Sequence, residues 1–425
     1  MRDPVLLKAE VDRRGIQGIK LSLERMHAAM EMLGHPELRI GRTILIAGTN
    51  GKGSVAAFLE ATLRQAGCRT ALYTSPHLVS MTERLVLSGK PVSPAQLDDA
   101  ASTVLQVETV LPGLLTGFEL ITAASFLCVA EERPDFAVVE VGLGGRLDAT
   151  NVVSPEVSVI TPLGMDHMKF LGPDLASITR EKLGITRPGV PCVISRQKPE
   201  AERLIHLHCG LQASRIVAEG RDFQGSGTPE CWSYKGLRCQ LDAVRLSLVG
   251  HYQVQNAAVA SAVAELLLPP ADCEAALVQG LTAASWPGRF DLRQAWGTPV
   301  VLDGGHNPPA IEALAEAWSR RYAHRPVVLY AAKEDKDVGS ILPVLERLSS
   351  RLLLTRPGRV AGHDPQALAA LVHAVPVEVI PDPAAAFRRL ASLTGGPHLC
   401  CGSLFLVGYC LEMLAGDLPD GGQRP

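Results

Sequence analysis

The sequence predicts an α/β protein with two domains. The N-terminal domain has a mostly parallel sheet with a small antiparallel section, and the C-terminal domain is a second α/β unit. The main observation is that short apolar runs, which suit buried strands, alternate with segments of helical periodicity. This alternation changes character between residues 220 and 250 and restarts after residue 299. A length of 425 residues also exceeds one ordinary domain core and favours two or three domains.

The first domain is expected to begin its sheet with the apolar run at 43–47. From Ser54, the apolar residues Val55, Phe58, Leu59 and Leu63 recur at helical spacing, and Gly67 marks the expected stop. Further buried strands are predicted at 70–73, 136–141, 157–161 and 191–195. The stretch CWSYKGLRCQLDAVRLSLVG, within 220–250, predicts short antiparallel strands, and a helix is expected to begin near residue 252.

The second domain is expected to be a Rossmann-like α/β domain of roughly 130 residues. Its predicted strands are VVLDGG, PVVLYAA, RLLLT, VEVI and HLCCG, each separated from the next by a helical pattern. Strands that alternate with helices imply a parallel sheet with right-handed crossovers. The resulting division is a domain at 1–288, a linker at 289–297, a domain at 298–417 and a disordered tail at 418–425.

Composition excludes several classes of function. The net charge of -3 offers no basic surface for nucleic acid. The longest apolar run, 120–130, covers roughly half of a membrane span, and the N-terminus is charged too early for a signal peptide. Ten cysteines lie without C-x-x-C pairs, which favours reduced thiols and a cytoplasmic protein. We expect no nucleic-acid or membrane partner.

The stretch LIAGTNGKGSVAAF, residues 45–58, resembles a phosphate-binding loop but departs from the pattern G-x-x-x-x-G-K-[ST]. Ile46 replaces the first glycine, and Gly53 replaces the hydroxyl residue that helps hold magnesium. A strand, a glycine-rich turn and a helix are nevertheless predicted in the right order, and helix N-terminal N–H groups suit an anion. Lys52 could reach terminal phosphates. The alternative is a plain β–α turn with a solvated lysine.

Polar side chains also follow the other predicted strands. Ser75 lies in YTSPHL, Glu140 lies near the end of an apolar strand, and Asp166 and His167 follow the strand at 157–161. A buried carboxylate is costly without a partner, so a metal or cation is favoured beside Glu140. A lone histidine is more often structural. Because ligands bind at the carboxyl edge of an open parallel sheet, Glu140 and His167 together with the loop predict a magnesium site beside phosphates.

Further polar residues lie on a helix and in the second domain. Lys182 is on a presumed helix, where alone it would be a surface lysine. Asp303 and His306 follow a second-domain strand, where Asn307 could simply be a helix N-cap. Arg289 lies at the domain boundary, where its alternative role is a salt bridge. With no Ser-His-Asp, cysteine-nucleophile or zinc pattern, the chemistry indicates a magnesium-dependent ATP user with its site between two α/β domains.

The motifs, taken in order, resemble one family: the bifunctional dihydrofolate synthases/folylpolyglutamate synthases of the Mur ligase superfamily. The resemblance runs from about residue 23 to about residue 408. The matching stretches are AGTNGKGS, YTSPHL, ERLVLSGKPVS, FELITAASF, EVGLGGRLDATN, DHMKFLG, REKLGI, GHYQVQNAAVA, WPGRF and DGGHNP. No single stretch is decisive, but their joint order is highly specific.

The resemblance implies an ATP-dependent ligase that adds L-glutamate to dihydropteroate or to a folate through an acyl phosphate, working as a monomer. It implies catalytic roles for Lys52, Glu140, His167, Lys182 and His306. It implies nucleotide contacts at Thr49, Asn50, Gly51, Lys52, Gly53, Ser54, Asn256, Arg289, Asp303 and His306. It implies magnesium ligands at Ser75, Glu140 and His167, a carbamate on Lys182 beside a second magnesium, and a pterin pocket at Phe118, Glu119, Thr122, Asp148 and Ala149.

The departures from the family pattern are few. The usual DGAHN is DGGHN here, and the segment PGRVAGHDP is looser than usual, which leaves the glutamate site least defined. One alternative is a ligase acting on a nucleotide-linked peptidoglycan precursor. It is disfavoured by FELITAASF and YTSPHL and by the lack of a preceding nucleotide-sugar domain. A second alternative is a nucleotide-binding regulator without catalysis, which the intact Glu140, His167, Lys182 and His306 disfavour.

Overall fold

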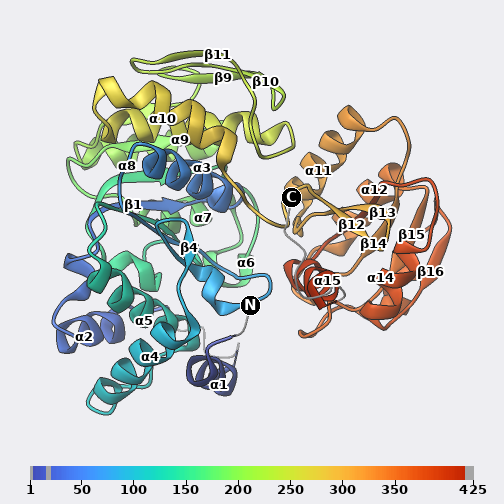
Figure 1. Cartoon of the computed structure of the whole chain (residues 1–425), viewed down its shortest axis with the longest axis horizontal. Helices are drawn as coiled ribbons and strands as arrows, with labels where there is room; N and C mark the ends of the chain where they lie inside the picture. The colour runs from blue at the N-terminus through green and yellow to red at the C-terminus, as the bar shows by residue number, and fades with distance from the viewer. Residues whose placement is uncertain (1–2, 16–20, 417–425) are drawn as a thin grey trace. The chain divides into compact units, whose positions relative to one another are not determined.

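The chain folds into two compact units (Figure 1). The computed structural model describes residues 3–15 and 21–416, and the predicted tail at 418–425 lies outside these ranges. The first unit extends to Ser247 and resumes over Gln253–Ser285, whereas the second takes Leu248–Tyr252 and continues from Trp286. Within the described ranges, no helix has the length and apolarity that a membrane crossing requires.

The first unit is built on an eight-stranded sheet of order β4-β3-β2-β5-β1-β6-β7-β8. Its strands are β1 (Arg42–Ala47), β2 (Thr70–Tyr73), β3 (Leu85–Leu87), β4 (Lys90–Pro91), β5 (Phe136–Glu140), β6 (Pro155–Ile160), β7 (Cys192–Ile194) and β8 (Ile216–Ala218). From β2 to β8 the neighbours pair in parallel, and β3 pairs antiparallel with β2 and β4. All strands predicted for this sheet are present.

Strand β1 lies at the centre of this sheet with β5 on one side and β6 on the other. Residues 44–47 of β1 are completely buried, which fits a continuous apolar run covered on both faces. The order of the strands reverses at β1. The carboxyl ends of β1, β5 and β6 therefore meet at a topological switch point, the place where open α/β sheets bind ligands.

Helices pack against this sheet. They are α1 (Val5–Arg14), α2 (Glu24–Met32), α3 (Lys52–Gln65), α4 (Pro94–Glu108), α5 (Gly117–Glu132), α6 (Met168–Leu171), α7 (Leu175–Leu183), α8 (Pro199–Leu211), α9 (Tyr252–Leu267) and α10 (Pro270–Ala283), with 3-10 turns η2 (Pro36–Leu38), η3 (Met81–Arg84) and η4 (Ala149–Val152). Figure 1 shows α3 beside α10 and α4 beside α5, pairs that pack closely. Gly67, with a φ of 82°, follows α3 as predicted.

The predicted antiparallel section is a three-stranded sheet of order β11-β10-β9. Its strands are β9 (Gln224–Thr228), β10 (Cys231–Lys235) and β11 (Gln240–Val244). The buried indole of Trp232 stacks on Tyr234 and donates its N–H to the carbonyl of Val254 at 3.0 Å. This contact fastens the small sheet to α9, which begins at Tyr252 as predicted.

The second unit has a six-stranded sheet of order β12-β13-β17-β14-β15-β16. Its elements are β12 (Asp291–Ala295), β13 (Thr298–Leu302), α11 (Pro308–Arg321), β14 (Val327–Tyr330), α12 (Val338–Leu348), β15 (Arg351–Leu354), α13 (Pro365–Ala369), β16 (Val377–Val379), α14 (Pro383–Ala391), β17 (His398–Cys401) and α15 (Leu404–Gly416). All its predicted strands are present, and all but β12 pair in parallel.

One prediction for this region is wrong. The segment 289–297 is not a linker, because Asp291–Ala295 form β12, which pairs antiparallel with β13 along its whole length. The strand escaped prediction because it is an edge strand whose first four side chains alternate between partly buried and exposed, so it shows no apolar run. The second unit therefore begins before this segment rather than after it.

Candidate active site

The glycine-rich loop after β1 is fastened to the loop after β6. The backbone N–H groups of Thr49 and Asn50 donate to the carbonyl of Pro162 at 3.0 and 3.3 Å, and the Thr49 hydroxyl exchanges hydrogen bonds with Gly164. Because these two amides already have an acceptor, the donors for an anion are those of the first turn of α3, over 52–54. The first N–H groups of a helix have no partner within the helix.

Gly51 is the residue that turns the loop into α3. Its φ is 86°, in the left-handed region that glycine adopts without strain. A Cβ at this position would also lie 2.6 Å from the side-chain oxygen of Asn256 on α9. The same face of α9 holds Gln253, which binds both the Ser54 hydroxyl and the Asn256 amide. Thus Asn256 lies against the loop, and its contact with a nucleotide stays a prediction.

Sequence reasoning missed Gln253. It is completely buried, donates to the Ser54 hydroxyl at 3.2 Å and accepts from Asn256 at 2.9 Å. A signal was present, because Gln253 and Asn256 are polar residues three apart on one face of a largely apolar helix.

Two lysines converge on one carbonyl of the loop. The ammonium groups of Lys52 and Lys182 lie 3.3 and 2.8 Å from the oxygen of Gly48. Lys182 comes from α7 and is buried, and burial first, then the charge of Lys52, lower its pKa from 10.5 to about 7. Lys52 also lies 3.8 Å from a carboxylate oxygen of Glu140. The buried Glu140 thus has the cationic partner that its position required.

The three predicted metal ligands are only partly brought together. The backbone N–H of Ser75 donates to Glu140 at 3.3 Å, so the ends of β2 and β5 adjoin. His167 precedes α6 in a left-handed conformation, with its Nε2 4.0 Å from Asp166, and its side chain is 40% exposed. Across the described residues, no group of three or more His, Cys, Asp or Glu side chains is spaced to hold a metal on its own.

This donor set nevertheless suits magnesium bound together with a nucleotide. Magnesium in such sites takes only one or two protein carboxylates and completes its shell with phosphate oxygens and water. Glu140 would supply the carboxylate, since it ends β5 at the switch point, beside the helix N-terminus where phosphates would lie. The hydroxyl that Gly53 lacks could come from Ser75, whose backbone already contacts Glu140.

The residues predicted for the pterin pocket lie on α5 and η4, which pack against each other. The Thr122 hydroxyl binds the hydroxyl of Tyr73, the last residue of β2, at 2.8 Å. The ring of Phe118 covers Gly142, where a Cβ would come within 2.4 Å of it. Ala149 is buried in η4. The structure therefore gathers these residues beside the ends of β2 and β5.

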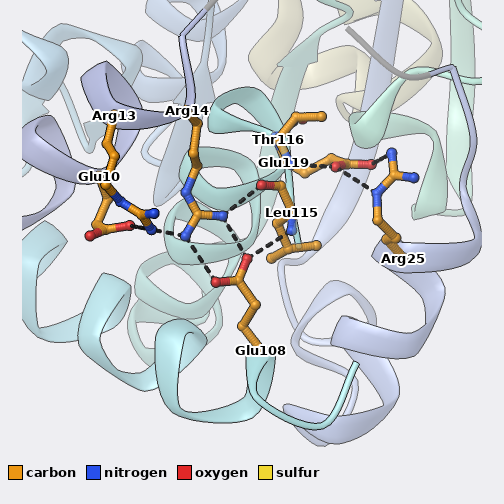
Figure 2. Close-up of polar contacts among 8 residues, drawn as sticks. All are labelled: Glu10, Arg13, Arg14, Arg25, Glu108, Leu115, Thr116 and Glu119. Atoms are coloured by element: carbon orange, nitrogen blue, oxygen red, sulfur yellow. Dashed lines mark hydrogen bonds and ion pairs between the residues drawn. The ribbon is translucent and has the colours of Figure 1, made fainter. Parts of the chain in front are cut away.

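Two carboxylates of this predicted pocket are already engaged within the protein. Asp148 is buried and accepts hydrogen bonds from the N–H of Leu143, and from the N–H and hydroxyl of Thr150. Burial raises its pKa, and these hydrogen bonds oppose the rise. Glu119 accepts from Arg25 and from the N–H of Thr116 (Figure 2). In this structure both carboxylates are hydrogen-bonded to the backbone and to neighbouring side chains of the protein.

The second unit contains the remaining predicted residues. Asp303 follows β13, is buried, and accepts from the N–H groups of Phe290 and Gly305 at 2.8 and 2.7 Å. Burial raises the pKa of Asp303, and the positive charge of Arg289 opposes the rise. The ring of His306 lies 2.8 Å from the carbonyl of Gly304.

Two other residues lie around the turn after β13. Asn307 accepts from Ala310 and caps α11, which confirms the predicted N-cap. Tyr252, which sequence reasoning did not single out, lies 3.4 Å from Asp303 through its hydroxyl. A turn held by a buried carboxylate therefore presents His306 at the carboxyl end of β13.

Family comparisons agree with this division of the chain. The Mur ligase middle domain matches residues 46–264, and the Mur ligase glutamate ligase domain matches residues 288–403. A phosphate-type loop at the switch point of the first unit, followed by a second α/β unit, is thus the arrangement of an ATP-dependent ligase of the Mur class.

Individual relatives identify the family within the Mur class of ligases to which the chain belongs. The chain is 36% identical over 355 residues to the dihydrofolate synthase/folylpolyglutamate synthase of Bacillus subtilis, covering 78% of this chain and 80% of the relative. It matches the Mycobacterium tuberculosis folylpolyglutamate synthase complexed with ADP and AMPPCP at a TM-score of 0.88 and 32% identity, covering 98% and 99% of the two chains. Escherichia coli FolC in complex with DHPP and ADP matches at a TM-score of 0.88, 27% identity and the same coverage. The chain belongs to the dihydrofolate synthase/folylpolyglutamate synthase family.

Proposed function

We propose that this protein joins L-glutamate to a carboxylate of dihydropteroate or of a folate, using ATP and releasing ADP and phosphate. The observation that carries the proposal is the convergence of Lys52 and Lys182 on the Gly48 carbonyl, with Glu140 beside them, at the switch point of the sheet. Two cations, a carboxylate and a helix N-terminus at one strand edge suit a nucleoside triphosphate with a divalent metal. Family membership supplies the acceptor and the amino acid.

The reaction needs activation of the acceptor, because a free carboxylate is a poor acyl donor. A carboxylate oxygen of the acceptor attacks the γ-phosphorus of ATP, ADP leaves, and an acyl phosphate forms. The amine of L-glutamate then attacks the carbonyl carbon, and phosphate leaves with the oxygen that came from the acceptor. Positioning and cation clamping account for most of the catalysis of phosphoryl transfer.

The chain's own residues provide that clamping. Lys52, at the first turn of α3, lies where it could neutralise charge on the terminal phosphates, and the amides of that turn would donate to their oxygens. Glu140, with Ser75 and His167, would hold a magnesium ion, whose positive charge would stabilise the developing negative charge on the transferred group. Relatives support this assignment, since one solved synthase contains Mn, AMPPNP and L-glutamate.

Lys182 is proposed to carry a carbamate that helps bind a second metal ion. Its pKa of about 7 leaves much of the amine neutral near pH 7, and only a neutral amine adds carbon dioxide. The carbamate would convert a buried cation into an anion beside Lys52. That change removes the like-charge repulsion that now contributes to lowering the pKa of Lys182.

The remaining assignments are also proposals. We infer that the first unit binds ATP and the folate, that the second unit, which continues from Trp286, forms the glutamate-ligase domain, and that Arg289, Asp303 and His306 contact the nucleotide. We further infer that Phe118, Thr122 and Ala149 border the acceptor pocket. A cytoplasmic monomer that binds only small molecules fits these roles.

Phosphate release tests the proposed function. Purified protein is incubated with ATP, magnesium and L-glutamate, with either tetrahydrofolate or dihydropteroate as acceptor. Phosphate release that requires both glutamate and acceptor is expected, and the better acceptor identifies which synthase activity dominates. If neither acceptor supports glutamate-dependent release, the proposed function is wrong.

A further inference from the structure

Glu119 forms a buried clamp with an arginine from another helix. Its side chain is 5% exposed, and Arg25 of α2 binds it with two nitrogens, Nη2 to Oε1 at 2.8 Å and Nε to Oε2 at 3.1 Å (Figure 2). Oε2 also accepts the N–H of Thr116 at 2.7 Å, and the Thr116 hydroxyl accepts the N–H of Glu119. Both carboxylate oxygens are therefore committed to holding the start of α5.

A second arginine holds the segment just before this turn. Arg14 of α1 binds both oxygens of Glu108 and donates to the carbonyl of Leu115 at 2.6 Å (Figure 2). Glu108 in turn accepts the N–H of Leu115 at 2.7 Å. Arginines from two different helices thus fix the backbone on both sides of Thr116, so the first turn of α5 has little freedom to move.

The clamped turn carries the side chains that reach the candidate active site. Phe118 packs on Gly142, two residues beyond Glu140, and Thr122 binds Tyr73, two residues before Ser75. A shift of this turn would move both contacts together. The ATP loop is held separately, through Thr49 on the loop after β6 and through Asn256 on α9.

We propose that Glu119 is a positioning residue that shapes the acceptor pocket through Arg25, and that it does not contact the acceptor itself. The proposal rests on the proposed function, because it names the folate or pteroate pocket. It changes the role predicted for Glu119 from the sequence, since a carboxylate engaged by Arg25 and Thr116 has its oxygens directed at the protein.

The test compares Glu119→Gln, Arg25→Gln and the double variant by steady-state kinetics. Each single change is expected to raise the acceptor KM about tenfold, within the range that a misplacement of about 1 Å can cause. Because both residues act as one unit, the double variant should lose no more than either single variant. The ATP KM should stay within about twofold, because the ATP loop has its own anchors.

Arg42→Gln is the matched control. Arg42 also forms a two-nitrogen pair with a glutamate, Glu156, on the same unit, but that pair is exposed. The Arg42→Gln variant should therefore leave the KM for the acceptor and the KM for ATP unchanged. Arg25→Lys keeps the charge without the planar fork, so it should fold and show a partial rise in acceptor KM. This variant carries the test if Glu119→Gln does not fold.

Several results would overturn the proposal. An acceptor KM that rises in Glu119→Gln but not in Arg25→Gln would mean that Glu119 contacts the acceptor directly. Losses in acceptor KM that multiply in the double variant, or an equal rise in the ATP KM, would also contradict it.

Equilibrium binding of folate, followed by protein fluorescence, distinguishes failure of the proposed function from failure of the positioning role of Glu119. Wild-type protein that binds folate without releasing phosphate refutes the proposed function alone, and the variants are then compared by their folate Kd. Wild-type protein that binds neither folate nor dihydropteroate refutes both the proposed function and the positioning role of Glu119.

Discussion

Replacing Lys182 with methionine should abolish the carbamate that we propose for this lysine. The buried ammonium of Lys182 lies 2.8 Å from the Gly48 carbonyl, and its pKa is about 7. At pH 7 about half of the amine is then neutral, compared with about one part in 3,000 for a lysine with a pKa of 10.5. Since only the neutral amine adds carbon dioxide, the reactive fraction is larger by about 1,500-fold.

The assay is carbon-13 NMR of the protein equilibrated with labelled carbon dioxide at fixed concentration between pH 6 and 8. A carbamate signal should grow as the pH rises through about 7, because the pKa is depressed and the neutral form appears above it. The signal should vanish in Lys182→Met and persist in Lys169→Met, which alters an exposed lysine near the same site. A signal that survives Lys182→Met, or none in the wild type, would refute the reasoning.

Three further predictions concern the loop, the metal site and the second unit. Glu140→Ala should lower kcat by at least about 100-fold while ATP still binds by calorimetry, because the amides of α3 remain; unchanged turnover would exclude the metal role. Gly51→Ala should raise the ATP KM, since its left-handed backbone costs about 1 kcal/mol and the new methyl displaces Asn256; an unaltered ATP KM would contradict this. Asp303→Asn should destabilise the second unit by about 1–3 kcal/mol in urea unfolding, because one amide oxygen cannot satisfy both Phe290 and Gly305; wild-type stability would show otherwise.

Much of the fold could be predicted from the local pattern of apolar residues in the sequence. Each apolar run that was predicted to be a strand is a strand in the structure, because strands buried on both faces leave an uninterrupted apolar signal. Strand β12 was not predicted, since an edge strand needs apolar residues on at most one face. The strand-end placement of Lys52 and Glu140 was also predictable. Parallel strands bring their carboxyl ends to one edge wherever they lie in the chain.

Long-range side-chain pairing was not predictable from spacing. Glu119 and Arg25 are 94 residues apart, and nothing in either local sequence indicates that they form a pair. The contact of Lys182 with Gly48, 134 residues away, was also not predictable from the local sequence. The lowered pKa of Lys182 was therefore not predictable either. Family resemblance singled out Glu119 and Lys182, but the contacts that suggest a positioning role for one and carbamylation for the other required the structure.

Transfer of an oxygen isotope tests the central claim most directly. The acceptor, folate or dihydropteroate, is labelled with oxygen-18 in its carboxylates and incubated with the protein, ATP, magnesium and L-glutamate. If the carboxylate attacks the γ-phosphorus of ATP, each phosphate released with amide product should contain one labelled oxygen, because the acyl phosphate breaks at its carbonyl carbon. Amide product accompanied by unlabelled phosphate, or by labelled AMP, would contradict the acyl-phosphate mechanism proposed for this protein.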